Sequence, residues 1–289
     1  MMAFARLVRL PALPSAVSNI VMAALAVGAL PERLPQFLLL LLGSACLYMA
    51  GMALNDWYDQ EEDQRERPER PIPAGQIPSR QAAWIGFGLL GLGVLLASLA
   101  ASPWLAGLLA GLIVLYNAAA KRGWLGPLVM GACRGVHVLL GCSLLGSPFT
   151  GVGPHLALVM GLYIVGVTWF ARGEAGTSKP GQLLAAAGVM LAALLLALAV
   201  PAPLPPDTAS PAFPYVLVVL GFLIGVPIVR AVQDPTPRRV QAAVRQQLQG
   251  VIVLDAALAC ATAGTLGLVV LVLWIPAWLL GGRGQVSAT

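Results

Sequence analysis

Long apolar segments alternate with short polar segments along the whole chain. Nine predominantly apolar runs each approach the ~20 residues that cross a bilayer as a helix. They cover about 12–30, 36–54, 82–100, 103–120, 124–146, 155–171, 181–200, 212–230 and 250–280. The runs are continuous and rich in Leu, Ala and Gly. We therefore predict an all-α polytopic membrane protein with nine transmembrane helices in one domain, residues 1–289.

Composition and charge placement agree with this pattern. Hydrophobic residues make up 58% of the chain and charged residues 10%, whereas a soluble domain carries about 25% charged residues. With the N-terminus inside, 15 of the 17 Lys and Arg fall on one side, and only Arg33 and Arg283 fall on the other. Because basic residues are retained in the cytoplasm, we predict an N-in, C-out protein of a bacterial-type inner membrane, with its active face cytoplasmic.

The net charge of +5 is explained by this topology and requires no nucleic acid as a partner. Lipid-facing and partner-facing apolar surfaces look alike in a single sequence. The oligomeric state is therefore left open.

The acidic residues are concentrated in one short segment. Seven of the twelve Asp and Glu fall between Asp56 and Glu69, at the end of the second apolar run. If this segment is helical, Asn55, Asp59 and Asp63 share one face, each about 40° round from the last. Hard oxygen ligands on one face suit Mg²⁺, which is often held by a few carboxylates plus substrate phosphates. The alternative is a solvated acidic loop that follows a helix.

Basic residues directly follow the acidic cluster in the sequence. Arg65, Arg67 and Arg70 precede the turn-forming stretch 71–75, which reads Pro-Ile-Pro-Ala-Gly. Carboxylates that bind a metal and guanidinium groups that bind phosphate oxygens together suit a Mg²⁺–diphosphate complex. A self-neutralising surface loop is the other interpretation of the same residues.

This arrangement resembles the first signature of the UbiA superfamily of intramembrane prenyltransferases, NDxxDxxxD followed by R-P-(I/L)-(P/A)-x-G. Here the signature reads Asn55-Asp56-x-x-Asp59-x-x-x-Asp63, with Arg70-Pro71-Ile72-Pro73-x-Gly75 downstream. A second stretch, Tyr116 followed by Lys121-Arg122, is similar to the basic motif that the family has between helices four and five. The resemblance implies nine transmembrane helices, an N-in arrangement and an active site that opens towards the cytoplasm.

The resemblance also implies a chemistry. An isoprenyl diphosphate is bound through Mg²⁺ in a central cavity, and its allylic cation is transferred to a lipophilic, usually aromatic, acceptor. The metal ligands implied are Asn55, Asp56, Asp59 and Asp63, and the catalytic residues implied are Asp59, Asp63 and Lys121. The substrate-binding residues implied are Arg9, Arg67, Arg70, Tyr116, Arg122, Arg172, Glu174 and Lys179. Mg²⁺ and cationic side chains would neutralise the charge of the departing diphosphate.

The chain departs from the family pattern at the cytoplasmic end of the sixth helix. The family has a second acidic motif there, DxxxD, whereas residues 169–179 contain Glu174 as their only carboxylate. Either Arg172 and Lys179 replace the second metal in a one-metal enzyme, or the protein binds, carries or helps to export a lipophilic metabolite without catalysis. The substitution resembles the divergent EboC-like branch of the superfamily. A CDP-alcohol transferase would need an Asp-Gly-x-x-Ala-Arg stretch, which the chain lacks.

Two further ionisable positions lie inside apolar runs. Arg134 lies about three turns into the fifth run with His137 three residues later, and Asp255 lies in the first half of the ninth. Charged residues within a membrane are costly and mark functional sites. An internal Arg134–Asp255 pair and a role in the binding pocket both remain open.

Overall fold

Helices form nearly all of the structure, a computed structural model that describes residues 2–172, 178–200 and 210–281. No strand occurs in these ranges. The elements of the first half are α1 (Met2–Leu7), η1 (Leu10–Ala12), α2 (Pro14–Ala26), α3 (Leu34–Tyr58), α4 (Gln60–Glu66), α5 (Ser79–Ala100), α6 (Pro103–Leu115) and η2 (Tyr116–Ala120). Those of the second half are α7 (Gly126–Cys142), α8 (Gly153–Ala171), α9 (Pro180–Leu198), α10 (Ala212–Gln233), α11 (Pro237–Ala263), η4 (Gly264–Leu273) and α12 (Trp274–Gly281).

Each predicted apolar run is helical, which confirms the all-α, multi-pass architecture. Seven helical segments of the described chain are long and apolar enough to cross a membrane: Leu34–Tyr58, Ser79–Ala100, Pro103–Ala120, Gly153–Ala171, Pro180–Leu198, Ala212–Gln233 and Pro237–Leu279. The other two runs form the shorter apolar helices Leu10–Ala26 and Gly126–Cys142. Seven α-helices carry proline at their first or second position, where its missing N–H costs no hydrogen bond: α2, α3, α6, α7, α8, α9 and α11.

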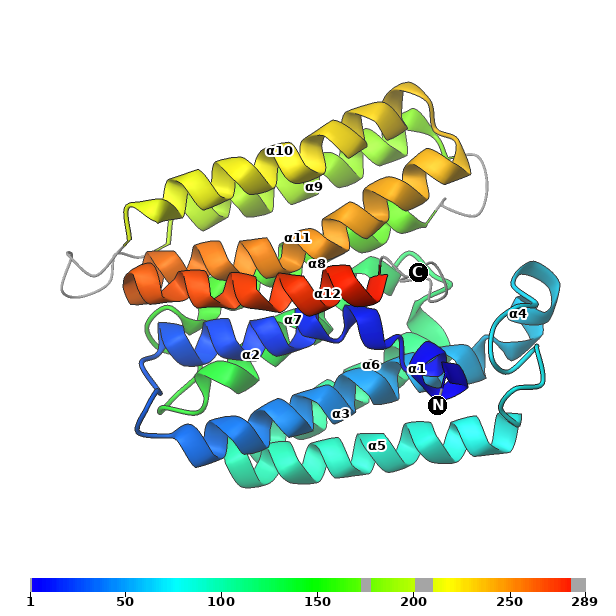
Figure 1. Cartoon of the computed structure of the whole chain (residues 1–289), viewed down its shortest axis with the longest axis horizontal. Coiled ribbons are helices and arrows are strands. Elements are labelled where there is room, and N and C mark those ends of the chain that lie inside the picture. Colours follow the sequence, from blue (N-terminus) through cyan, green and yellow to red (C-terminus); the bar gives the residue numbers. More distant parts are fainter. Residues whose placement is uncertain (1, 173–177, 201–209, 282–289) are drawn as a thin grey trace.

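The prediction of a single span over residues 250–280 is wrong. Helix α11 begins much earlier, at Pro237, and ends at Ala263, after which Gly264 takes a φ of 74° and the chain reverses. The η4–α12 segment then returns along α11, so closely that a Cβ on Gly267 would overlap the backbone nitrogen of Cys260. Figure 1 shows this return, with α12 beside α2 and the described chain ending near the N-terminal segments. The predicted C-out arrangement loses its support, because it assumed one crossing here.

Besides a small cluster of Leu7, Ala53, Ile77 and Ala82, the apolar core has two large parts. One cluster gathers buried side chains of α8 to α12, and the other gathers those of α3, α5 and α6, while α2 and α7 contribute to both. The second part is held by close packing of α3 on α5, where a Cβ on Gly93 would lie 2.9 Å from the backbone nitrogen of Leu47. Small residues at such contacts let helix backbones approach. The site described next lies between the two parts.

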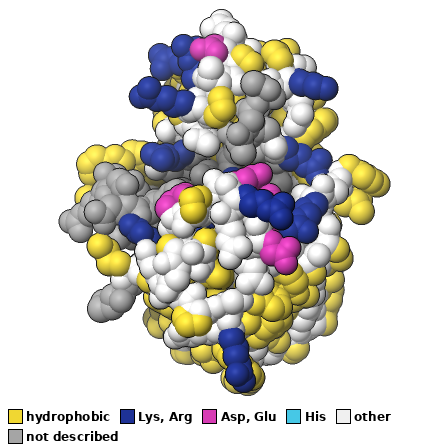
Figure 2. Space-filling view, turned by 90° about the vertical axis from the view of Figure 1, so that its right-hand side faces the viewer, with side chains coloured by type: hydrophobic (Ala, Val, Ile, Leu, Met, Phe, Trp, Pro, Cys, Tyr) yellow, Lys and Arg dark blue, Asp and Glu magenta, His cyan; other side chains and the backbone are white. Residues whose placement is uncertain are grey.

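Charged side chains gather at the end of the bundle that carries α4 and the N-terminal helix. Figure 2 looks onto this end and shows Lys, Arg, Asp and Glu side chains across its centre, with apolar side chains on the flanks. Arg33 lies at the opposite end, just before α3 begins. The charge asymmetry that the sequence predicts is therefore present in the fold.

Candidate active site

A cavity of about 920 Å³ opens at the charged end, between the two parts of the core. Its wall is built from η1, α2, α3, α4, η2 and α7 on one side and from α8, α9, α11 and α12 on the other. Ten of the sequence-predicted site residues line it: Arg9, Asn55, Asp59, Arg67, Arg70, Tyr116, Lys121, Arg122, Arg172 and Lys179. Residues more than 100 positions apart in the chain thus meet in one cavity.

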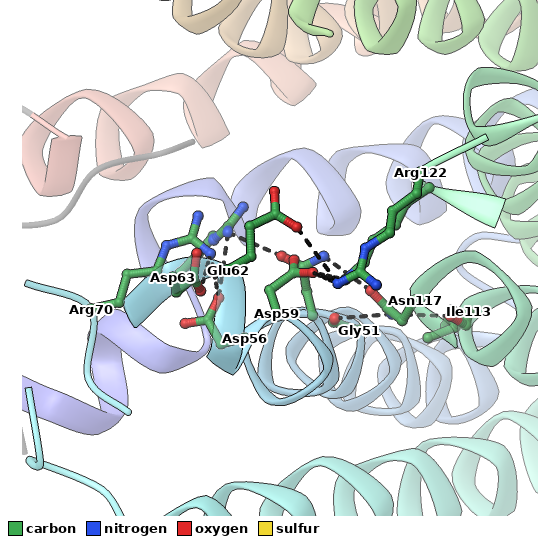
Figure 3. Close-up of polar contacts among 12 residues, drawn as sticks. Gly51, Asp56, Asp59, Glu62, Asp63, Arg70, Ile113, Asn117 and Arg122 are labelled. Atoms are coloured by element: carbon green, nitrogen blue, oxygen red, sulfur yellow. Dashed lines mark hydrogen bonds and ion pairs between the residues drawn. The ribbon is translucent and has the colours of Figure 1, made fainter. Parts of the chain in front are cut away.

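The end of α3 presents Asn55 and Asp59 to the cavity. The backbone N–H of Asp59 donates to the carbonyl of Asn55 at 3.0 Å, so the two side chains follow each other by one helical turn. The Asn55 amide donates to Asn117 Oδ1 at 3.1 Å, and Arg9 Nη2 donates to Asn55 Oδ1 at 3.2 Å. Asn117 in turn donates to the carbonyl of Ile113 at 3.0 Å (Figure 3). Asn55 is therefore fixed from two sides, with its oxygen towards the cation of Arg9.

Asp56 and Asp63 do not line the cavity with Asn55 and Asp59. Both carboxylates are buried, and both accept hydrogen bonds from Arg70, at 3.3 Å for Asp56 and 2.7 Å for Asp63. Figure 3 shows Asp63, Asp56 and Arg70 together and Asp59 turned towards Arg122. The expected single row of ligands is divided, because each step of four residues rotates the side chain by about 40° and Asp63 thereby reaches Arg70. The arrangement gives no support to Asp56 and Asp63 as metal ligands.

Lys121 is brought into the cavity by the π-helical turn η2. This turn, Tyr116–Ala120, directly follows α6 and ends with the Lys121 N–H donating to the carbonyl of Tyr116 at 3.0 Å. Single π-helical turns within α-helices are frequent at functional sites. Lys121 Nζ lies 2.6 Å from Asp59 Oδ1, and Arg122 Nη2 lies 3.8 Å from the same oxygen. Burial lowers the pKa of Lys121, and the hydrogen bond and charge of Asp59 partly offset that effect.

The side formed by α8, α9 and α11 is cationic. Arg172 and Lys179 line it with the polar side chains of Thr168 and Gln182, and Arg172 donates to the carbonyl of Gly123. Arg245 of α11 also lines the cavity. No carboxylate of α8, α9 or α11 is among the described lining residues, and Glu174 lies outside the described ranges.

Some lining residues were not predicted from the sequence. Glu62 and Tyr48 were not singled out in the sequence, and Arg245 lies in residues 231–249, a stretch with the basic residues Arg238, Arg239 and Arg245. The only available signal for Arg245 was that stretch of basic residues on the predicted active face. Arg134 also lines the cavity, so of the two interpretations given for it, a position in the pocket is the one observed.

The residues fit a Mg²⁺ ion that shares its coordination with a phosphate. No group of three His, Cys, Asp or Glu side chains is arranged to hold a metal in the described part of the chain. Mg²⁺ is commonly bound by one or two carboxylates plus substrate phosphates, and dedicated all-protein cages are unusual for it. Asn55 and Asp59 offer oxygens of this type from successive turns, and the ammonium group of Lys121 balances the charge of Asp59.

Curated relatives match a short part of this chain. Digeranylgeranylglyceryl phosphate synthase of Metallosphaera sedula is 41% identical over 64 residues, 22% of this chain and 22% of that protein. The enzyme of the same name from Thermococcus kodakarensis is 39% identical over 75 residues, and protoheme IX farnesyltransferase of Paracoccus denitrificans is 42% identical over 60. The chain thus spans about a fifth to a quarter of the length of these relatives.

Solved structures match the fold over most of its length. A structure of digeranylgeranylglyceryl phosphate synthase has a TM-score of 0.65 at 19% identity, covering 90% of this chain and 97% of that one. A UbiA homologue from Archaeoglobus fulgidus, bound to GPP and Mg²⁺, has a TM-score of 0.60 at 14% identity, covering 89% and 99%. At these identities the likeness concerns the fold alone.

The family model of the UbiA prenyltransferase family matches residues 13–251, which contain the acidic segment, the basic turn and every helix of the cavity except η1, the second half of α11 and α12. The resemblance read from the acidic and basic motifs is thereby confirmed, and the chain belongs to the UbiA prenyltransferase family.

Proposed function

We propose that this protein transfers a prenyl group from an isoprenyl diphosphate to a lipophilic acceptor within the membrane, with Mg²⁺ as cofactor. The observation that carries the proposal is the meeting of Asn55, Asp59 and a ring of cationic side chains in one cavity of a UbiA-family fold. In the reaction, the bond between the allylic carbon and the diphosphate oxygen breaks. The allylic carbon bonds to the acceptor, which releases a proton to solvent.

Asn55 and Asp59 are the side chains that would hold the metal from the cavity wall. A bound Mg²⁺ would neutralise charge on the departing diphosphate. Lys121, Arg9 and Arg122 lie around the same carboxylate and amide, at distances of 2.6 to 3.8 Å. Their donors are placed to bind phosphate oxygens, because guanidinium and ammonium groups form charge-assisted hydrogen bonds with phosphate. Asp56 and Asp63 serve by holding Arg70 at the cavity wall.

We assign one metal to this site. The side of the cavity formed by α8, α9 and α11 offers Arg172, Lys179 and Arg245 where a second metal would require carboxylates. Fixed cations stabilise a leaving diphosphate by the same electrostatic means as a metal. The apolar helices around the cavity limit the access of water to the allylic cation. We also place the charged end at the cytoplasmic face of a bacterial-type inner membrane, from the distribution of Lys and Arg.

The test is Mg²⁺-dependent binding of geranylgeranyl diphosphate to the purified protein in lipid nanodiscs. Asp59→Asn removes the charge that faces the cavity, and Glu61→Gln is the matched control, since Glu61 is exposed in the same segment and does not line the cavity. We expect binding that EDTA and Asp59→Asn each weaken at least tenfold and that Glu61→Gln leaves unchanged. Binding indifferent to both Mg²⁺ and Asp59 would refute the proposal and favour a carrier of lipophilic metabolites in the same fold.

A further inference from the structure

Basic side chains gather where α10 meets α11, outside the cavity. Arg230 lies in the last turn of α10, and Arg238 and Arg239 lie in the first turn of α11. All three are exposed, and none of them is among the described lining residues of the cavity. Figure 2 shows basic side chains at the top of the charged end, where these two helices meet. We call Arg230, Asp234, Arg238 and Arg239 the α10–α11 patch.

Contacts between the two helices hold these cations together. Arg239 Nη1 donates to the backbone carbonyl of Arg230 at 3.4 Å, and Arg239 Nε lies 3.3 Å from Asp234 Oδ2. The connection between the helices comprises residues 234–236, and one proline within it and another directly after it restrict its backbone. The patch is therefore formed before a ligand binds, so little conformational entropy is lost on binding.

The positive charge of the patch is not balanced by acidic side chains. Three guanidinium groups share one carboxylate, that of Asp234, and no ion pair joins Arg230 or Arg238 to an acidic side chain in the described part of the chain. Arg238 and Arg239 also stand at the start of a helix, where the helix dipole disfavours positive charge. Like charges held close together repel each other, and an added anion would relieve this repulsion.

The patch borders an apolar, exposed surface of α10. Phe222 and Val226 precede Arg230 by two turns and one turn of this helix, and they are 73% and 46% exposed. Val229, next to Arg230, is exposed as well. Apolar side chains so exposed on a membrane-spanning helix face lipid tails, and arginines near the end of such a helix reach the level of the headgroups. The guanidinium groups of the patch therefore lie beside lipid rather than beside the substrate cavity.

We propose that the α10–α11 patch binds the phosphate headgroup of an anionic phospholipid, whose acyl chains lie along Phe222 and Val226. Arginine forms paired, charge-assisted hydrogen bonds with phosphate oxygens. Basic side chains beside a membrane-spanning helix also attract anionic lipids. Retention of basic residues in the cytoplasm depends on their number and side, and it does not require two helices to bring them together at one lipid-facing edge. The site is separate from the cavity and does not depend on prenyl transfer.

The test measures binding of phosphatidylglycerol to the full-length protein in neutral detergent micelles by native mass spectrometry. Phosphatidylcholine with the same acyl chains is the counterpart without net charge, and we expect it to bind at least tenfold more weakly. The double variant Arg230→Gln, Arg238→Gln should weaken phosphatidylglycerol binding at least tenfold. The control Arg33→Gln, Arg80→Gln removes the same charge from exposed positions elsewhere and should leave the affinity within about threefold. Equal losses in the two double variants, or no preference for phosphatidylglycerol, overturn the proposal.

A further variant should increase the affinity of the patch. Asp234→Asn removes the carboxylate that Arg239 pairs with, while the arginines remain. Phosphatidylglycerol binding should therefore strengthen about threefold or more. If the Asp234–Arg239 ion pair were needed only to hold the two helices together, the variant would bind the lipid more weakly, and that result would refute the inference.

Two comparisons separate the patch from the cavity and a lipid from a soluble anion. The double variant Arg172→Gln, Lys179→Gln removes two cations of the cavity. It should leave phosphatidylglycerol binding within about threefold, and a tenfold loss would place the lipid in the cavity and overturn the proposal. Glycerol phosphate has the same phosphate chemistry without acyl chains and should bind at least tenfold more weakly. Equal affinity for glycerol phosphate would make the patch a site for soluble anions and overturn the proposal.

Discussion

Replacement of Arg70 by methionine should destabilise the fold through one carboxylate, that of Asp63. Arg70, Asp56 and Asp63 are 8%, 3% and 2% exposed, so the cluster they form is largely shielded from water. Asp56 retains a second ion pair, with Arg9 at 3.5 Å, when Arg70 is removed. The side chain of Asp63 has no described ion-pair partner other than Arg70. The substitution therefore leaves one carboxylate buried and unpaired.

The size of the stability loss depends on whether the Asp63 carboxylate stays charged or takes up a proton. Removing one partner of a buried ion pair costs about 3–5 kcal/mol. An unpaired buried carboxylate can instead take up a proton, which at pH 7 costs about 4 kcal/mol because an ordinary aspartate has a pKa near 3.9. At pH 5 the same proton costs only about 1.5 kcal/mol. The expected loss is thus about 3–4 kcal/mol at pH 7, and it shrinks as the pH falls, because the unfolded chain prefers the charged carboxylate less.

The assay is reversible unfolding in mixed micelles at pH 7 and pH 5, with Arg70→Met, Asp63→Asn and the double variant. Neutralising Asp63 removes the unpaired charge, so the double variant should recover most of the stability lost in Arg70→Met. Arg65→Met is the control, since Arg65 is exposed in the last turn of α4, five residues before Arg70. A loss no larger than that of the control, or no recovery in the double variant, would show that the Arg70–Asp63 pair does not hold this segment.

Three other outcomes follow from the site and the fold. Burial lowers the pKa of Lys121. Diphosphate affinity should therefore begin to fall at a pH below roughly 10.4, where ordinary lysine titrates. The variant Lys121→Arg stays charged and should remove this loss of affinity at alkaline pH, as measured by binding isotherms. Titration of Mg²⁺ against diphosphate binding should give a log–log slope of one, and a slope of two would require a second metal. Gly93→Ala should lower the free energy of unfolding by about 1–3 kcal/mol, because its Cβ would lie 2.9 Å from the backbone nitrogen of Leu47. A Cβ on Gly91 would meet nothing within 4 Å, so Gly91→Ala should leave the free energy of unfolding unchanged. Equal losses in the two variants would contradict the packing of α3 on α5.

Much of the fold follows from the sequence because a bilayer restricts the choices. Apolar runs of suitable length must be helical, since no water is present to satisfy an irregular backbone. The side of the bundle that carries the chemistry also follows, because Lys and Arg accumulate there together with the segment 55–70. The cavity residues Asn55 and Asp59 could be named from their spacing, and Lys121 from the resemblance to the family's basic motif, before their contacts were known.

The remainder depends on contacts that spacing does not encode. The reversal at Gly264 lies within one apolar run that carries no charged residue between Asp255 and Arg283. Asp63 shares a helical face with Asp59 by sequence, but Arg70 decides where its carboxylate points. The Arg134–Asp255 relation could be suspected as a pair, yet Asn19, from a third helix, separates them.

The charges of the cavity explain why the loss of the second acidic motif is compatible with diphosphate chemistry. In the proposed site, a diphosphate bound to one Mg²⁺ on the α3 side would still carry negative charge, and α8, α9 and α11 form the opposite side of the cavity. A second cluster of carboxylates there would repel the diphosphate unless a second metal were bound between them. Arg172, Lys179 and Arg245 provide positive charge directly, with no metal to recruit. The same substitution raises the positive potential of the cavity as a whole, which favours anionic ligands there.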